Sequence, residues 1–264
     1  MKKLSKIYMA FVMLFLYLPI FVLIVFSFNE TKSRSVFSGF TFDWYAKLFS
    51  NELIMTSLRN TLIVSVTAAV IATILGTVAA IGINAMRKPA RAITLNITNI
   101  PIINPEIVTG VSLMLLFVFF AARMNFEFGF GTLLIAHITF NVPYVILNVM
   151  PKFRQMNPHL YEAAQDLGCN PFKAFFKVVL PEIMPGIVSG FLMSFTFSLD
   201  DFIISYFTSG ATSQTLPITI YSMTRRKVSP EINALSTIIF IVVVIALISK
   251  NMVESKTTKK EGIK

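Results

Sequence analysis

Long apolar runs without charge constrain this chain more than any other feature of its sequence. Neither residues 7–28 nor residues 60–86 contain Asp, Glu, Lys or Arg. A helix needs about 20 apolar residues to cross the hydrocarbon core of a bilayer. Because backbone groups inside a membrane must pair within helices or closed barrels, these runs predict transmembrane helices.

Four further apolar segments raise the expected number of spans to six. Pro101 and Pro105 break the start of the third span. Between the first two spans, Trp44 and Tyr45 belong to a short amphipathic segment that we expect at the membrane surface. The predicted fold class is all-α, a polytopic membrane protein whose single domain covers residues 1–264. The four further spans are expected at residues 107–122, 128–150, 185–208 and 232–249.

The net charge of +10 does not indicate a nucleic-acid partner. Charged residues make up only 14% of the chain, against about 25% in soluble domains. The basic residues lie in loops and tails beside the apolar runs, and such residues concentrate on the cytoplasmic side of a membrane. Six spans place both termini on one side, together with most of the 23 Lys and Arg residues. We therefore expect both termini in the cytoplasm.

The sequence also limits the chemistry of the chain. Cys169 is the single cysteine, which excludes a disulfide within one chain, and no Cys/His cluster offers a structural zinc site. The chain lacks a Gly-x-x-x-x-Gly-Lys-Ser/Thr phosphate loop, so it does not hydrolyse ATP by that route. We expect no catalytic residue, metal or cofactor in this chain.

The longest polar interval between apolar segments, residues 152–182, carries paired helix signals. Asn157 and Asn170 each precede a proline, which places an N-cap side chain before the first helical position. Gly168 offers a C-terminal stop, because glycine adopts the left-handed conformation without a Cβ clash. The local prediction is a helix over residues 158–167, a turn at 168–170, a helix over 171–179 and a break at Pro181.

Two adjacent acids lie deep in the fifth span. If the helix is continuous, Asp201 shares a small and polar face, whereas Asp200 points about 100° away. A buried carboxylate at that depth faces a bundle interior or a wet path. Asp201 therefore either makes a structural hydrogen bond or lines a path for a cationic solute. The shared face consists of Gly190, Ser194, Ser198, Asp201, Ser205 and Thr208.

Glu106 and His137 raise the same question. Glu106 follows a proline-broken stretch, and irregular backbone at membrane depth is tolerated where it lines a cavity or is covered by protein. Glu106 either faces a pathway, which we favour, or sits in water at the inner interface. His137 is either a group that handles protons or a hydrogen-bonded packing residue, and we favour packing.

The polar interval resembles a known element. Glu162-Ala163-Ala164, then Gly168, then Leu180-Pro181 is similar to the cytoplasmic coupling loop of ABC importer permeases. In that family the first short helix docks into a groove of the ATP-hydrolysing subunit. The resemblance implies that the small Ala163 and Ala164 allow close docking and that Gly168 sets the turn.

Nearly the whole chain resembles the second of the two permease subunits of spermidine/putrescine ABC importers. Segments such as 40–45, 104–108, 194–201 and 229–235 carry this resemblance. It implies the type I ABC importer permease fold, with a core over residues 60–250, in a bacterial inner membrane. It also implies a sister permease that completes a heterodimer, two copies of an ATPase that bind ATP and Mg, and an external polyamine-binding protein. On this hypothesis the substrate pathway includes Asp201, Asp200, Glu106, Ser198 and Ser194.

Two alternatives remain. The same machinery could carry another solute, such as ferric iron, thiamine or a phosphonate, although an anion fits poorly with Asp201 on the polar face. From a different class, a stand-alone ion-coupled transporter could use Glu106, His137 and Asp201 as proton sites. Dependence on a co-purifying ATPase separates the two classes.

Overall fold

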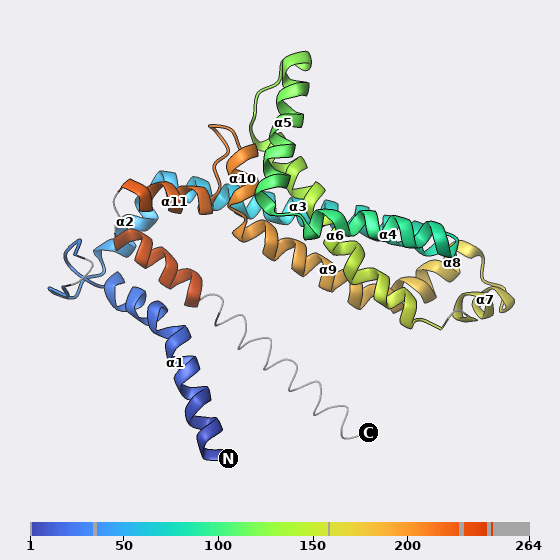
Figure 1. Ribbon diagram of the computed structural model, residues 1–264, viewed down its shortest axis with the longest axis horizontal. Coiled ribbons are helices and arrows are strands. Elements are labelled where there is room, and N and C mark those ends of the chain that lie inside the picture. Colours follow the sequence, from blue (N-terminus) through green and yellow to red (C-terminus); the bar gives the residue numbers. More distant parts are fainter. Residues whose placement is uncertain (1, 34–35, 158, 227–229, 242–243, 245–264) are drawn as a thin grey trace. The chain divides into compact units, whose positions relative to one another are not determined.

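A computed structural model describes residues 2–33, 36–157, 159–226, 230–241 and 244. Its regular structure is helical, and the described residues add only an isolated antiparallel bridge between Asn29 and Phe40. The elements in chain order are α1 (Lys2–Ser27), α2 (Asp43–Ser50), α3 (Glu52–Ala85), α4 (Lys88–Ile103), α5 (Glu106–Met124), α6 (Phe130–Gln155), α7 (His159–Asp166), α8 (Pro171–Ala174), the π-helix η1 (Phe175–Val179), α9 (Leu180–Asp200), α10 (Ile203–Thr208) and α11 (Leu216–Arg226) (Figure 1).

Five of the described helical stretches are long and apolar enough to cross a membrane. They are Leu4–Ser27, Glu52–Ala85, Glu106–Met124, Phe130–Gln155 and Pro171–Asp200. A shorter apolar helix, Pro230–Ile241, lies where the sixth span was expected, and most of the remainder of that span falls outside the described residues. The all-α prediction is confirmed. The basic stretch before the third span and the polar stretch before the sixth form helices of their own, α4 and α11.

The chain divides into two compact units. One comprises Met1–Met55 with Ile220–Lys264, and the other comprises Thr56–Thr219. In the first unit, the expected amphipathic segment is the helix α2. The buried Trp44 indole N–H donates a hydrogen bond of 2.7 Å to the backbone oxygen of Asn29, and Tyr45 pairs with Ser27. These contacts tie α2 to the end of α1.

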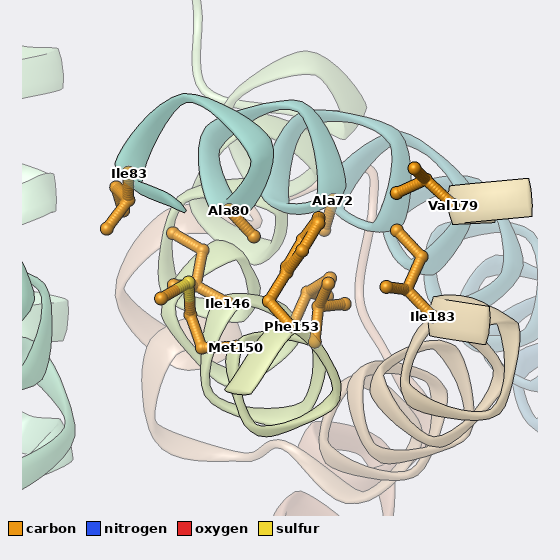
Figure 2. Packing of buried hydrophobic residues seen from close by; sticks show 10 residues of the cluster. Ala72, Ala80, Ile83, Ile146, Met150, Phe153, Val179 and Ile183 are labelled. Atoms are coloured by element: carbon orange, nitrogen blue, oxygen red, sulfur yellow. The ribbon is translucent and has the colours of Figure 1, made fainter. Parts of the chain in front are cut away.

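The core of the second unit lies between α3, α6, η1 and α9. Figure 2 shows Phe153 of α6 among Ala72 and Ala80 of α3 and Val179 and Ile183 at the η1–α9 junction. Small residues allow the helices to approach closely, as is usual between membrane helices. A Cβ on Gly190 of α9, for example, would lie 3.2 Å from the Cα of a valine in α6.

Two expectations about helix ends are wrong. Pro181 does not break the chain, because it lies in the first turn of α9, directly after η1. The Leu180 N–H bonds to the Phe175 oxygen across the wider π turn, so the hydrogen-bond ladder is already displaced before the residue that lacks an N–H. The second expectation concerned the fifth span, which is not one continuous helix to Thr208, since α9 ends at Asp200 and α10 begins at Ile203.

Candidate functional site

A cavity of about 470 Å³ lies in the second unit, where α9 gives way to α10. Its lining comes from the α4–α5 junction, from α6 and from both sides of the α9–α10 break. Helix α10 packs against α5 and α6, which brings segments far apart in the sequence around one space.

Three carboxylates line this cavity: Glu106, Asp200 and Asp201. Glu106 lies in the first turn of α5, where the helix dipole favours an anion. Asp200 is the last residue of α9, and both Glu106 and Asp200 are exposed. No Lys or Arg is found among the described residues that line the space. The cavity therefore carries an excess of negative charge and attracts cations.

Aromatic rings form much of the remaining wall. They come from Phe140 and Tyr144 of α6, Phe197 of α9 and Phe202 in the break. The rings of Tyr144 and Phe197 meet at 4.6 Å between centroids, at an angle of 62°. An aromatic face attracts an ammonium group through its quadrupole, so carboxylates and rings together fit an organic cation.

Asp201 has a different environment from Asp200. Asp201 is only 9% exposed, and its carboxylate accepts hydrogen bonds from the backbone N–H groups of Ile204 (3.3 Å) and Ser205 (2.7 Å). Its Oδ2 also lies 3.6 Å from Nε2 of the buried His137. Asp201 thus caps the start of α10, while Asp200 is the more accessible of the two carboxylates. Asp200 is exposed and Asp201 is buried, which agrees with the expectation that the two side chains point in different directions.

Two predicted pathway residues lie outside the cavity lining. Ser198 is buried and bonds to His137 Nδ1 (2.9 Å) and to the Asn141 amide (2.8 Å). The Ser194 hydroxyl is buried without a hydrogen-bond partner among the described residues. His137 also bonds to Ser205 across the break (3.0 Å), so the preferred interpretation of His137 as a hydrogen-bonded packing residue is confirmed. The polar face predicted for the fifth span is buried against α6.

The aromatic wall was not predicted from the sequence. One signal was present: Phe197 precedes Asp200 by three residues, which places both on one face of a helix. Phe140 and Tyr144 are four residues apart and likewise share a face of α6. No local pattern pairs either set with Glu106, because that juxtaposition depends on how α5, α6 and α9 pack.

The second candidate site is the polar interval before α9. Gly168 has a φ of +86°, as its predicted turn requires. The Asn170 side chain accepts a hydrogen bond of 2.8 Å from the Lys173 N–H, and the Asn157 side chain accepts one of 3.0 Å from the His159 N–H. The expected helix start at residue 158 falls outside the described residues. Asn157, Asn170 and Gly168 thus shape the helix–turn–helix through local hydrogen bonds and backbone conformation.

The residues singled out in this interval differ in exposure. Glu162 and Ala163 are exposed on α7, with Glu162 3.4 Å from the His159 ring, whereas Ala164 is buried within the chain. Ala164 therefore packs inside the protein and does not offer a surface to a partner. Pro181 is exposed and Leu180 half-buried.

Exposed apolar side chains surround the same turn. Leu167 is 87% exposed, Phe172 is 72% exposed and Phe176 is 49% exposed. The rings of Phe172 and Phe176 pack together at 4.7 Å. A cluster of this kind at the end of a bundle is typical of a protein interface. These residues were not predicted from the sequence, because the exposure of a side chain depends on tertiary packing.

Sequence comparison places the chain among known transport components. A family model described as the inner membrane component of binding-protein-dependent transport systems matches residues 72–254. The chain is 33% identical over 255 residues to the spermidine/putrescine transport system permease protein PotC of Shigella flexneri, covering 97% of this chain and 95% of the relative. It is 39% identical over 229 residues to the putrescine transport system permease protein PotI of Escherichia coli K12, covering 85% and 81%.

Solved structures match the fold. A bacterial ABC transporter involved in the import of the acidic polysaccharide alginate has a TM-score of 0.70 at 15% identity, with 96% of this chain and 95% of that chain covered. The MetNI methionine ABC transporter in an inward-facing conformation has a TM-score of 0.55 at 16% identity, with 78% and 98% covered. At these identities the likeness shows the fold alone, which is that of ABC importer permeases.

Proposed function

The chain belongs to the family of inner membrane components of binding-protein-dependent transport systems, and from this premise we propose that it is the permease subunit of an ATP-driven polyamine importer. Relatives named as spermidine/putrescine and putrescine permeases align over most of its length. The observation that carries the choice of solute is the cavity in which Glu106 and Asp200 stand beside aromatic rings.

The cavity provides groups that can replace the hydration of a polyamine. A polyamine carries several positive charges, and its desolvation inside a membrane is costly unless each charge is compensated. Accessible carboxylates supply charge-assisted hydrogen bonds to the ammonium groups. The faces of Tyr144 and Phe197 supply cation–π contacts to the ammonium groups and apolar contacts to the methylene segments. We assign direct contact to Glu106 and Asp200 and a supporting role to Asp201, whose oxygens already cap α10.

Coupling to ATP hydrolysis is assigned to the helix–turn–helix around Gly168. The exposed Glu162 and Ala163 and the apolar cluster of Leu167, Phe172 and Phe176 form the surface that would dock on an ATPase subunit. The stretch from Pro171 to Asp200 is helical throughout, so a displacement of the docked turn would reach the cavity through one rigid element. ATP and Mg would be bound by that partner.

The remaining partners follow from the same proposal. A sister permease would complete the translocation path, and an external polyamine-binding protein would deliver the solute, as in the fold neighbour whose structure includes a ligand-bound periplasmic protein. Both termini would face the cytoplasm, which agrees with the distribution of Lys and Arg. The chain would lie in the inner membrane of a bacterium.

The test is uptake of labelled spermidine into proteoliposomes that hold the chain with its sister permease and ATPase, the loaded binding protein and ATP. Removing one contacting charge, by Glu106→Gln or Asp200→Asn, should lower uptake about tenfold, which corresponds to one lost charge-assisted hydrogen bond. Glu182→Gln is the matched control, because Glu182 is an exposed carboxylate of α9 that does not line the cavity.

Excess putrescine should compete with spermidine, and an anionic solute should not. Equal uptake by Asp200→Asn, Glu106→Gln and Glu182→Gln would show that the cavity is not part of the translocation path. ATP-dependent uptake of ferric iron or thiamine in place of spermidine would keep the permease and replace the solute.

A further inference from the structure

A second cavity of about 630 Å³ lies in the same compact unit and has the opposite charge. The ends of α3, α4 and α6 enclose it together with α7 and η1. Its polar wall consists of Asn84, Arg91, Arg154 and Tyr161. No carboxylate is present among the described residues that line it. The site is therefore basic, and it adjoins the helix–turn–helix assigned to coupling.

The Arg91 guanidinium is incompletely paired among the described residues. One of its terminal nitrogens donates to the Asn84 side-chain oxygen. Its Nε is buried and has no hydrogen-bond partner in the part of the chain that the structure describes. A buried donor of this kind is costly when left unsatisfied, and a guanidinium presents its donors in a fork that matches phosphate or carboxylate oxygens. Arg91 is thus arranged to receive an anion.

The start of α4 adds to the positive potential. Arg91 belongs to the first turn of this 16-residue helix, and the residue that precedes the helix makes no side-chain cap. Free N–H groups and the dipole at a helix N-terminus favour a bound anion. Arg154, which is exposed at the end of α6, brings a second guanidinium to the same cavity. These features come from different elements and favour the same kind of ligand.

The other wall is apolar. Phe153 and Val179 line the cavity and also belong to the hydrophobic core of the unit that Figure 2 shows. A ligand with an anionic head and an apolar body therefore fits better than a fully hydrated ion. Basic pockets between membrane helices on the cytoplasmic side are known to receive anionic lipid headgroups. The basic residues around this cavity predict that it lies on the cytoplasmic side.

We propose that this cavity binds a phosphate group, held between the guanidinium groups of Arg91 and Arg154. An anionic phospholipid headgroup is the source that the mixed lining fits best, and free phosphate is the other source of the same chemistry. Because Tyr161 of α7 and Phe175 of η1 complete the wall, a bound phosphate joins the coupling helices to the ends of α3, α4 and α6. The site is separate from the carboxylate cavity.

Native mass spectrometry of the full-length chain tests the proposal. The chain is purified in detergent with the subunits that accompany it and is exposed to phosphatidylglycerol or phosphatidylcholine. We expect retention of phosphatidylglycerol, and Arg91→Gln with Arg154→Gln should lower that retention at least about tenfold, since each guanidinium supplies charge-assisted hydrogen bonds. Arg123→Gln is the matched control, because that guanidinium lies 4.6 Å over the Phe119 ring on α5 and does not line the cavity.

A second arm distinguishes the two sources of phosphate. Inorganic phosphate is titrated without lipid, and binding that Arg91→Gln abolishes would assign the site to the free anion. Should the double variant fail to assemble, Arg154→Gln alone carries the test, because its side chain is exposed. Equal retention of both probes by the site variants and by Arg123→Gln would overturn the proposal. Since the readout is binding, this result is independent of the transported solute.

Discussion

At the scale of single residues, glycine decides how closely α9 approaches α6. A Cβ on Gly186 would lie 2.8 Å from the Asn148 backbone oxygen and 2.8 Å from the Lys152 side chain. The backbone oxygen cannot move away without a shift of the helix. By contrast, a Cβ on Gly82 of α3 would meet no atom of the described residues within 4 Å. The two glycines are both helical, but only Gly186 is required by packing.

This difference leads to a prediction. Gly186→Ala should destabilise the protein by about 1–3 kcal/mol, as overpacking of a close contact does. Gly82→Ala should be neutral or stabilise by up to about 1 kcal/mol, because alanine is the better helix former. Thermal unfolding of the two purified variants in one detergent provides the comparison. A midpoint for Gly186→Ala at or above that of Gly82→Ala would refute the packing argument.

At the scale of elements, the turn between α7 and α8 depends on one backbone conformation. Gly168 has a φ of +86°, and a Cβ there would meet nothing within 4 Å. A substitution at this position therefore acts through backbone strain alone. Asparagine tolerates the left-handed region, whereas proline fixes φ near −65°. Comparing a proline and an asparagine substitution at this position therefore separates the effect of a disrupted turn from the effect of replacing glycine.

Gly168→Pro should abolish ATP-driven uptake, because the turn that connects the two coupling helices can no longer form. Gly168→Asn should retain most of the uptake. Both are measured in the spermidine proteoliposome assay, with assembly of the complex followed by size-exclusion chromatography. Undiminished uptake by an assembled Gly168→Pro complex would remove this turn from coupling.

For the molecule as a whole, the family and the fold both indicate one component of a multi-subunit transport system. The family model covers residues 72–254, and the solved permeases share the fold over most of this chain. The spermidine/putrescine permease of Shigella flexneri aligns over 95% of its own length. The stand-alone ion-coupled alternative would use Glu106, His137 and Asp201 as proton sites. In the structure, His137 and Asp201 are instead engaged in hydrogen bonds across the α9–α10 break.

We therefore expect the chain alone in liposomes, with a proton gradient but without an ATPase subunit, to give no spermidine uptake. Adding the sister permease, the ATPase, the loaded binding protein and ATP should restore it. The measurement is accumulation of labelled spermidine under the two conditions. Gradient-driven uptake by the isolated chain would favour the ion-coupled carrier.

Features that depend on residues close together along the chain could be predicted from the sequence. Apolar length predicts a span because burial in lipid is a sum over consecutive side chains, and five described helices confirm it. The left-handed Gly168 and the cap at Asn170 are equally local, since each involves residues within one turn. Family membership also follows from sequence alone.

Contacts between polar groups that are far apart along the chain could not be predicted in this way. Glu106 and Asp200 share a cavity because α5, α6 and α10 pack together, and no pattern along the chain encodes that contact. A break after Asp200 ended the fifth span earlier than expected, and a π turn precedes Pro181, where a break was expected. Arg91 and Arg154 likewise come together from different helices. Such pairings depend on long-range packing, whereas the sequence patterns extend only over a few turns.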